Sequence, residues 1–172
     1  MQVRDATAAD LPMILDIYNE IIANTTAVYS EQPVTLEDRR LWWRNRAEQH
    51  YPVLVACDAG GVMGFASFGD FRAWACYRHT VEHTVHVRAD CRGRGVGKQL
   101  LSALFPRAVD LGKHVMIAGI DAANSTSIGL HEHLGFERVA HFREVGRKFG
   151  RWLDLVFLQR WLDAPGASRG PG

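Results

Sequence analysis

Hydrophobic residues recur along the chain at two spacings, three to four residues in some segments and about two in others. Ile14, Ile17 and Ile21 follow the first spacing, so we predict an amphipathic helix that packs one apolar face inward. A capping box at residues 7–10 opens this helix, and a second capping box at residues 35–38 predicts a second helix.

Runs rich in valine and leucine, bounded by turn residues, predict the strands. Turn residues at 58–61 join two of these runs into a β-hairpin. Residues 95 to about 111 form a third helix, a short fourth helix follows Asn124, and residues 24–33 are irregular. The predicted strands are residues 2–5, 51–56, 62–71, 80–87, 114–120, 138–145 and 153–159. Strands that alternate with helices in this way, without repeats, predict an α/β (α+β) fold.

Composition limits the chain to one domain and removes several classes of protein. Its 172 residues are 47% hydrophobic and 23% charged, which suits a single globular domain at residues 1–163, followed by a disordered tail at residues 164–172. A net charge of +1 argues against a general nucleic-acid binder. With no signal-like start, no run long enough to span a membrane and three scattered cysteines read as reduced thiols, we expect a cytoplasmic protein.

A glycine-rich segment joins the predicted strand at residues 80–87 to the third helix. It reads Arg92-Gly93-Arg94-Gly95-Val96-Gly97. Glycines let the backbone turn tightly and bring its N–H groups close to an anion, and the helix that follows presents its positive end. We therefore predict a cradle for phosphate oxygens.

Two better-known phosphate loops do not fit these letters. A Walker A loop needs glycine at position 92 and serine or threonine at position 99, where Arg92 and Gln99 stand. A Rossmann fingerprint needs a glycine where Lys98 stands.

The pattern that fits is Arg/Gln-x-x-Gly-x-Gly/Ala, and with it the chain resembles the GNAT acetyltransferases over nearly its whole length. The resemblance implies a GNAT fold, in which a central mixed, mostly antiparallel sheet of about seven strands is flanked by about four helices. It also implies that the sheet is splayed where acetyl-CoA binds. The alternative to a phosphate cradle is a glycine-rich turn that precedes an ordinary helix and binds nothing.

Four separated segments resemble one branch of that family, the phosphinothricin acetyltransferases. They are residues 24–27, 69–72, 80–85 and 148–154. Members of this branch acetylate the α-amino group of phosphinothricin, methionine sulfoximine or methionine sulfone, which is a detoxification reaction. The resemblance also leads us to expect a homodimer.

The resemblance implies two sets of site residues. Those that would bind acetyl-CoA are Val85, His86, Val87, Arg92, Gly93, Arg94, Gly95, Val96, Gly97, Lys98 and His133. Those that would line the amino-acid site are Arg72, Ala73, Trp74, Glu82 and Asn124. In the first set the backbone N–H of Val87 is the implied donor to the oxyanion that forms during acyl transfer.

The chemistry independently requires a base, because an α-amine is largely protonated at neutral pH and must lose a proton before it attacks a thioester. Glu82 is the candidate, since it lies just before the cradle and shares a strand face with Thr84 and His86. The proton would pass from the acceptor ammonium to Glu82 either directly or through one water molecule. The alternative for Glu82 is a surface carboxylate held in a salt bridge.

One position departs from the wider family. Many GNAT enzymes carry a tyrosine before the Gly-Phe turn that protonates the departing thiolate, and His131 stands there in this chain. Histidine can donate a proton near pH 7, so His131 is the candidate general acid.

Recognition of the acceptor is predicted from residue type. Arg72 suits a carboxylate or oxyanion of an amino acid and Trp74 supplies an apolar wall, the alternatives being a solvated charge and loop packing. We interpret residues 148–154 primarily as a structural element, a hairpin turn, rather than as part of the acceptor site. No metal is expected, because neither His131 and His133 on a helix nor His83 and His86 on a strand point the same way, and Cys91 has no catalytic signature.

Three functions remain open from the sequence. The first is acetyl transfer to a small amino acid or its analogue. The second is acetylation of peptide N-termini or of other amines such as aminoglycosides or polyamines. The third is a non-catalytic acyl-CoA sensor, against which Glu82 and Asn124 both argue.

Overall fold

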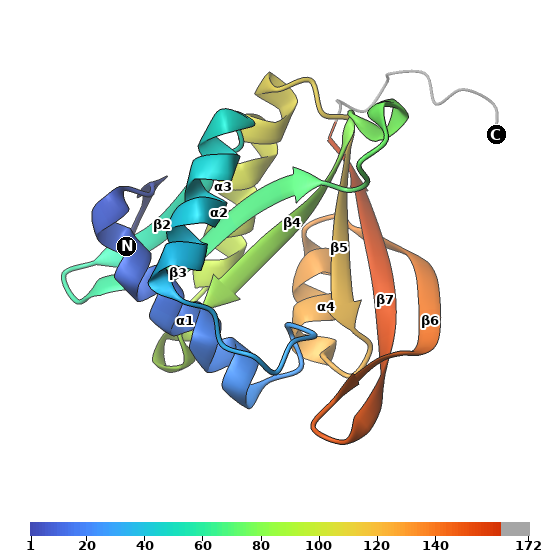
Figure 1. Ribbon diagram of the computed structural model, residues 1–172. Helices are drawn as coiled ribbons and strands as arrows, with labels where there is room; N and C mark the ends of the chain where they lie inside the picture. The colour runs from blue at the N-terminus through green and yellow to red at the C-terminus, as the bar shows by residue number, and fades with distance from the viewer. Residues whose placement is uncertain (163–172) are drawn as a thin grey trace.

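A single seven-stranded sheet forms the centre of the molecule in the computed structural model, which describes residues 1–162 (Figure 1). The predicted disordered tail at residues 164–172 lies outside the described residues. The strand order is β1-β2-β3-β4-β5-β7-β6, and every neighbouring pair is antiparallel except β4 with β5. The strands are β1 (Gln2–Asp5), β2 (Val53–Asp58), β3 (Gly61–Asp70), β4 (Thr80–Val87), β5 (Val115–Asp121), β6 (Glu137–Lys148) and β7 (Arg151–Trp161). The expected mixed, mostly antiparallel sheet is confirmed.

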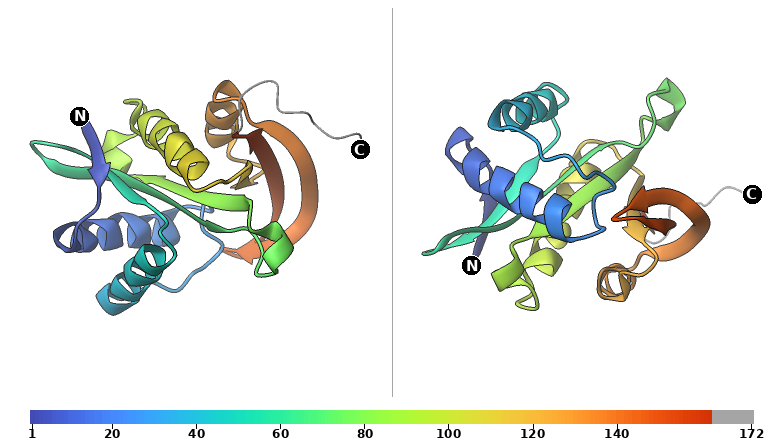
Figure 2. Two further views of the ribbon diagram at one scale, coloured as in Figure 1. Left: turned by 90° about the horizontal axis from the view of Figure 1, so that it is seen from above. Right: turned by 60° about the horizontal axis from the view of Figure 1, so that its bottom comes forward.

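Four α-helices of the described chain cover the two faces of this sheet. They are α1 (Leu11–Asn24), α2 (Leu36–Glu48), α3 (Val96–Asp110) and α4 (Ser125–His133). Helices α1 and α2 lie on one face, and α3 and α4 lie on the other (Figure 2). None of these helices is long and apolar enough to cross a membrane.

Each face has its own hydrophobic core, which the spacing of apolar residues explains. Ile14, Ile17 and Ile21 of α1 pack on Val55 and Phe65 in the first core, as the sequence predicts. Leucines of α3 pack on β3, β4 and β5 in the second. Because strand residues alternate between faces, β2 and β3 contribute to both cores.

Both predicted capping boxes form, with one refinement. The box at residues 35–38 caps α2 directly, whereas the box at residues 7–10 opens a short 3-10 turn (Ala8–Asp10), after which α1 begins at Leu11. Asp10 also binds Arg4 of β1 at 2.7 Å, which ties the start of the helix to the sheet.

The last two strands extend beyond their predicted ends. They run to Lys148 and from Arg151, joined by a tight turn in which Phe149 and Gly150 have positive φ angles of 49° and 73°. The ends carry charged residues, so hydrophobicity did not mark them, yet backbone pairing continues there. Irregular pairing between Phe142 and Gly146 bends the hairpin.

The sheet splays between its two parallel strands. β4 and β5 pair only from Thr80 to Glu82 on one side and from Val115 to Ile117 on the other, although β5 continues to pair with β7 as far as Asp121. Beyond Glu82 the two strands diverge (Figure 1). The expected splay is confirmed, and it places the second half of β4 at an open edge.

Candidate functional site

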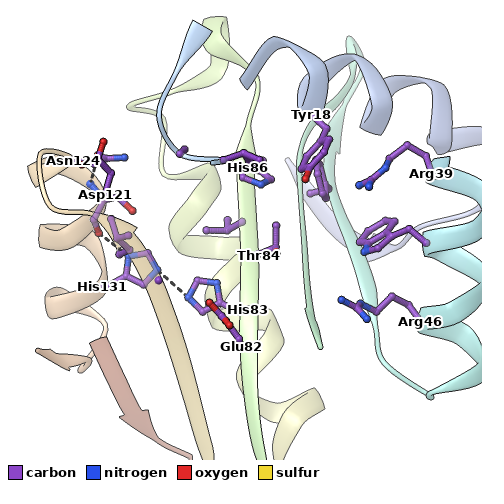
Figure 3. Close-up of a pocket in the computed structure, with 18 residues that line it drawn as sticks. Tyr18, Arg39, Arg46, Glu82, His83, Thr84, His86, Asp121, Asn124 and His131 are labelled. Carbon is purple, nitrogen blue, oxygen red and sulfur yellow. Dashed lines mark hydrogen bonds between the residues drawn. The ribbon is translucent and has the colours of Figure 1, made fainter. Parts of the chain in front are cut away.

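A cavity of about 400 Å³ lies at the splay, which is a size suited to a small molecule (Figure 3). Its walls come from α1, α2, the loop between them, β4, the end of β5 and α4. The ionisable and amide side chains in these walls include Arg39, Arg46, Glu82, Asp121, Asn124 and His131.

Glu82 reaches this cavity from β4 and is half-buried. Gly119 of β5 leaves room for its carboxylate, because a Cβ at Gly119 would lie 2.9 Å from Glu82 Oε1. Burial raises the pKa of Glu82, and the charge of Arg72 lowers it in part. Within residues 1–162 no cation forms an ion pair with Glu82, so the alternative of a salt-bridged surface carboxylate does not describe it.

His131 comes from α4 and is paired with a residue that the sequence reading did not connect to it. Its Nδ1 lies 2.6 Å from the Ser127 carbonyl oxygen, and its Nε2 lies 3.1 Å from Nε2 of His83. The two rings stack with centroids 5.0 Å apart. Burial lowers the pKa of both histidines, which favours the neutral rings.

This pairing constrains the proton on His131. A carbonyl oxygen can only accept, so Nδ1 of His131 donates to Ser127 and its Nε2 accepts from His83. Nδ1 of His83 is then buried without a partner. His131 therefore differs from a tyrosine at this position, because in this arrangement both of its nitrogens are engaged, and its role as the acid stays a prediction.

The predicted cradle begins α3. Gly93 and Gly95 have φ angles of +74° and +78°, and a Cβ added to either would meet nothing within 4 Å, so the loop faces open space. Main-chain bonding of the helix starts with the N–H of Gln99, which donates to the Gly95 carbonyl at 3.1 Å. The N–H groups before it are the free donors that a helix offers at its first turn.

Three cations surround this first turn. Lys98 Nζ lies 3.2 Å from His133 Nε2, which brings the predicted His133 to the cradle. Arg92 is held by Glu20 at 2.9 Å and also donates to the Val87 carbonyl. Arg94 lies 3.7 Å from Asp58. Free N–H groups at a helix start, with cations beside them, fit the pyrophosphate of a coenzyme A thioester.

The open edge of β4 supplies the other half of the cofactor site. Arg88 N–H donates to the Met63 carbonyl of β3, so even-numbered residues of β4 bond to β3 by strand alternation. The peptide groups of Val85 and Val87 therefore face the gap that β5 leaves. The Val87 carbonyl there accepts from Arg92, and the other peptide groups that face the gap suit the amide-containing arm of coenzyme A.

His83 and His86 lie on opposite faces of β4, as predicted. His86 packs between the rings of Tyr18 and Phe65 on the α1 side, and burial lowers its pKa to about 4. His83 contacts α4. Residues 1–162 hold no cluster of three or more His, Cys, Asp or Glu side chains arranged for a metal. Cys57, Cys76 and Cys91 are free thiols, and Cys91 is buried.

The predicted acceptor residues divide into two groups. Asn124 lines the cavity and caps α4, where its Oδ1 accepts from Ser127 N–H at 3.0 Å. Arg72, Ala73 and Trp74 lie in the exposed β3–β4 loop and are not among the residues that line the cavity. Trp74 is 71% exposed, and the Arg72 guanidinium packs 4.1 Å from the Phe71 ring. These three residues stay a prediction.

The sequence reading missed the α2 wall and the end of β5. Arg39, Trp42 and Arg46 stand three and four residues apart, so one helix face presents all three to the cavity. Figure 3 shows the two arginines. That spacing was visible in the sequence. Asp121 accepts hydrogen bonds from the Thr26 hydroxyl and the Ala123 N–H, and a contact with residue 26 could not be read from local spacing.

Comparison with known proteins agrees with this architecture. Residues 14–136 match the family described as the acetyltransferase (GNAT) family. An L-methionine sulfoximine/L-methionine sulfone acetyltransferase from Pseudomonas aeruginosa is 56% identical over 162 residues, covering 94% of each chain.

Two solved structures are also similar. A phosphinothricin acetyltransferase from Sinorhizobium meliloti, in complex with acetyl-CoA, is 41% identical, with 98% of this chain and 91% of that chain covered and a TM-score of 0.93. A ribosomal-protein-alanine N-acetyltransferase from Brucella melitensis is 46% identical, with 94% and 99% covered and a TM-score of 0.92. The chain belongs to the GNAT acetyltransferase family.

Proposed function

We propose that this protein transfers the acetyl group of acetyl-CoA to the α-amino group of a small amino acid or analogue such as methionine sulfone, methionine sulfoximine or phosphinothricin. The observation that carries the proposal is Glu82, a half-buried carboxylate that has no ion-pair partner within residues 1–162 and stands in a small cavity at the splay. The names of the Pseudomonas and Sinorhizobium relatives support this class of substrate.

Different parts of the chain bind different parts of acetyl-CoA. Acetyl-CoA supplies a thioester whose carbonyl carbon the amine attacks. The pyrophosphate of the cofactor is held by residues 92–98, at the start of α3, and by His133. The open edge of β4 holds the amide-containing arm that carries the acetyl group. The N–H of Val87 donates to the oxygen that gains negative charge. No group of the protein needs to form a covalent bond with the acetyl group.

Glu82 acts as the base that removes a proton from the acceptor ammonium, directly or through one water. Its raised pKa brings it closer to neutrality, where a base both stays ionised and accepts a proton readily. His131 stays the proposed acid for the departing thiolate; to act as one its ring must take up a second proton in the complex, because in the structure the Nδ1 proton is donated to Ser127 and burial lowers the pKa of the ring. Arg72 and Trp74 lie in the exposed β3–β4 loop, and we propose that they meet the acceptor there.

The test is release of free thiol from acetyl-CoA with a panel of amines. Glu82→Gln should lower kcat by about 10²- to 10⁴-fold, the usual contribution of a general base, and leave the Kd of coenzyme A unchanged. Glu137→Gln, an exposed carboxylate of β6, is the matched control and should retain activity. Full activity in Glu82→Gln would remove Glu82 from the mechanism.

The same panel tests the other activities. Thiol release with a peptide N-terminus or a polyamine, and with no amino acid, would move the chain to another substrate class within the family. The Brucella relative is named for a protein substrate, so a peptide starting with alanine belongs in the panel. Tight binding of acetyl-CoA without turnover on any amine would identify a sensor.

We further propose that the protein works in the cytoplasm as a homodimer. Exposed apolar side chains gather on the last hairpin, and they include Val139, Phe142, Val145 and Trp152. Such a patch is typical of a protein interface. Sedimentation equilibrium distinguishes a dimer from a monomer.

A further inference from the structure

One wall of the cavity, formed by α2, carries two positive charges. Arg39 and Arg46 lie seven residues apart, two helical turns, with Trp42 between them on the same face. The Trp42 ring lies 4.9 Å from the Arg39 guanidinium carbon and 6.0 Å from that of Arg46. Figure 3 shows both arginines extending from α2 toward β4.

Arg39 is a buried cation that forms no ion pair among the residues that the structure describes. The residue is only 9% exposed, and its Nε is buried with no hydrogen-bond partner. The Tyr18 ring lies 4.3 Å from its guanidinium carbon. The adjacent carboxylate, Asp38, instead accepts from the N–H and hydroxyl of Thr35. Within residues 1–162 no carboxylate forms an ion pair with Arg39.

Arg46 places a second charge beside the proposed base. Its guanidinium packs over Gly69, where an added Cβ would lie 2.5 Å from Nη2. Gly69 is the strand partner of Glu82 in the register of β3 and β4. Nη1 of Arg46 donates to Gln49 at 3.1 Å, whereas its Nε is buried without a partner.

Leaving Arg39 without a carboxylate is costly, because ring contacts with Tyr18 and Trp42 replace only part of the hydration that its buried guanidinium loses. Burial lowers the pKa of both arginines, and the two charges disfavour one another at Arg39. Arginine nevertheless stays protonated at neutral pH. An anion in the cavity would supply the missing partner.

Positive and negative side chains lie on opposite sides of the cavity. The cations stand on the α2 wall, and the carboxylates of Glu82 and Asp121 stand on the β4 and β5 side. An amino acid carries the same separation, with an ammonium that must approach Glu82 and oxygen atoms that can face α2. The fork of a guanidinium matches a pair of such oxygens.

We propose that Arg39, with Arg46 beside it, binds the oxyanion oxygens of the acceptor amino acid, supplied by its α-carboxylate or by the sulfone, sulfoximine or phosphinate group of its side chain. This inference rests on the proposed function and specifies which residues select the acceptor. It assigns to α2 a recognition role in addition to the one predicted for Arg72.

Arg39→Met tests the inference, because it keeps an unbranched side chain that can fill part of the same space and removes the charge. The KM for methionine sulfone should rise about 10- to 100-fold, as expected for loss of a charged hydrogen-bonded contact. The Kd for methionine sulfone, measured calorimetrically with coenzyme A present, should rise equally. The Kd of coenzyme A should not change.

Two further variants separate recognition from folding. Arg40→Met, an exposed arginine on the same helix, is the matched control and should leave both constants unchanged. Arg39→Lys keeps the charge and should recover part of the affinity. Because Arg39→Met removes an unpaired buried charge, its Tm should equal or exceed that of the wild type.

Substrate analogues identify which oxygens are bound. If Arg39 binds the α-carboxylate, the wild type should discriminate against the α-carboxamide of methionine sulfone and Arg39→Met should not. If it binds the side-chain oxygens, the wild type should prefer methionine sulfone to methionine and the variant should lose that preference. Equal behaviour of wild type and variant toward all three compounds would overturn the inference.

Other outcomes are equally decisive. An unchanged KM and Kd in Arg39→Met, or a lower Tm together with weaker coenzyme A binding, would make Arg39 a structural residue. If the wild type acetylates no amino acid, the proposed function fails. In that case the calorimetric Kd for methionine sulfone alone tests the role of Arg39. If methionine sulfone does not bind to the wild type, the role proposed for Arg39 is also overturned.

Discussion

Single buried residues at the site have their ionisation set by desolvation. Burial raises the pKa of Glu82 and lowers the pKa of His83, His86 and His131, so each neutral form is favoured. For a base this brings the pKa nearer to working pH. For the histidines it means that packing depends on their remaining unprotonated.

As the pH is lowered, the fold should therefore lose stability at pH values above those at which carboxylates are normally protonated. The pKa of His86 falls from about 6.5 in an unfolded chain to about 4 in the structure, through burial and the charges of Arg39 and Arg92. Below pH 6.5 the unfolded state takes up the proton first, so the free energy of unfolding falls. His86 alone should remove about 1 kcal/mol between pH 7 and pH 5.5.

His86→Phe checks this expectation by preserving the ring contacts with Tyr18 and Phe65 and removing the titration. The Tm of the variant should fall less than that of the wild type over this pH range. His50→Asn, at an exposed histidine, should follow the wild type. Parallel curves for all three proteins would show that His86 does not contribute to acid lability.

At the scale of elements, the start of α3 combines backbone geometry with a ligand site. Gly95 adopts φ +78° at the N-cap, and its Cβ position is open. Alanine there strains the backbone and also places a methyl group where a phosphate would approach. The two effects can be separated because Gly112, at the other end of α3, has a similar φ of +67° and equally open space.

Gly95→Ala and Gly112→Ala should therefore lose similar stability, about 1 kcal/mol each, measured by denaturant unfolding. Only Gly95→Ala should weaken coenzyme A, by about tenfold or more in Kd, because only that glycine borders the cradle. If both variants bind coenzyme A as the wild type does, the cradle does not require the open backbone of Gly95.

At the scale of the whole molecule, two halves of the sheet meet at the short β4–β5 pairing, and the loop between α1 and α2 bridges them. Buried Lys148 donates to the Val28 carbonyl at 2.8 Å, and the Tyr29 hydroxyl donates to the Asp154 carbonyl. Val28 lines the cavity. The last hairpin thus supports a cavity wall, which agrees with a structural role for residues 148–154.

Lys148→Met should loosen that wall. Proteolytic cleavage within residues 25–34 should accelerate and the KM for the acceptor should rise several-fold, because the Val28 carbonyl loses its donor, whereas the Kd of coenzyme A should stay constant. Arg147→Met, at the neighbouring exposed arginine, is the control. Unchanged proteolysis and KM in Lys148→Met would show that the hairpin does not hold the loop.

The sequence by itself predicted the elements, and its resemblance to a known family implied the splay and the roles proposed for residues 92–98 and Glu82. These depend on local spacing, on glycines that permit turns, and on a motif shared with a known family. The sequence did not mark the ends of β6 and β7, because their charged ends pair through backbone groups that leave no hydrophobic pattern.

Only the tertiary structure decided which side chains meet in the cavity. It stacked His83 on His131, 48 positions away, turned Arg39 inward with no carboxylate ion pair in the described part of the chain, and left Trp74 at the surface. The physical reason is that periodicity fixes the face of an element on which a side chain lies. The neighbour it meets, and the burial that sets its pKa, depend on how distant elements pack.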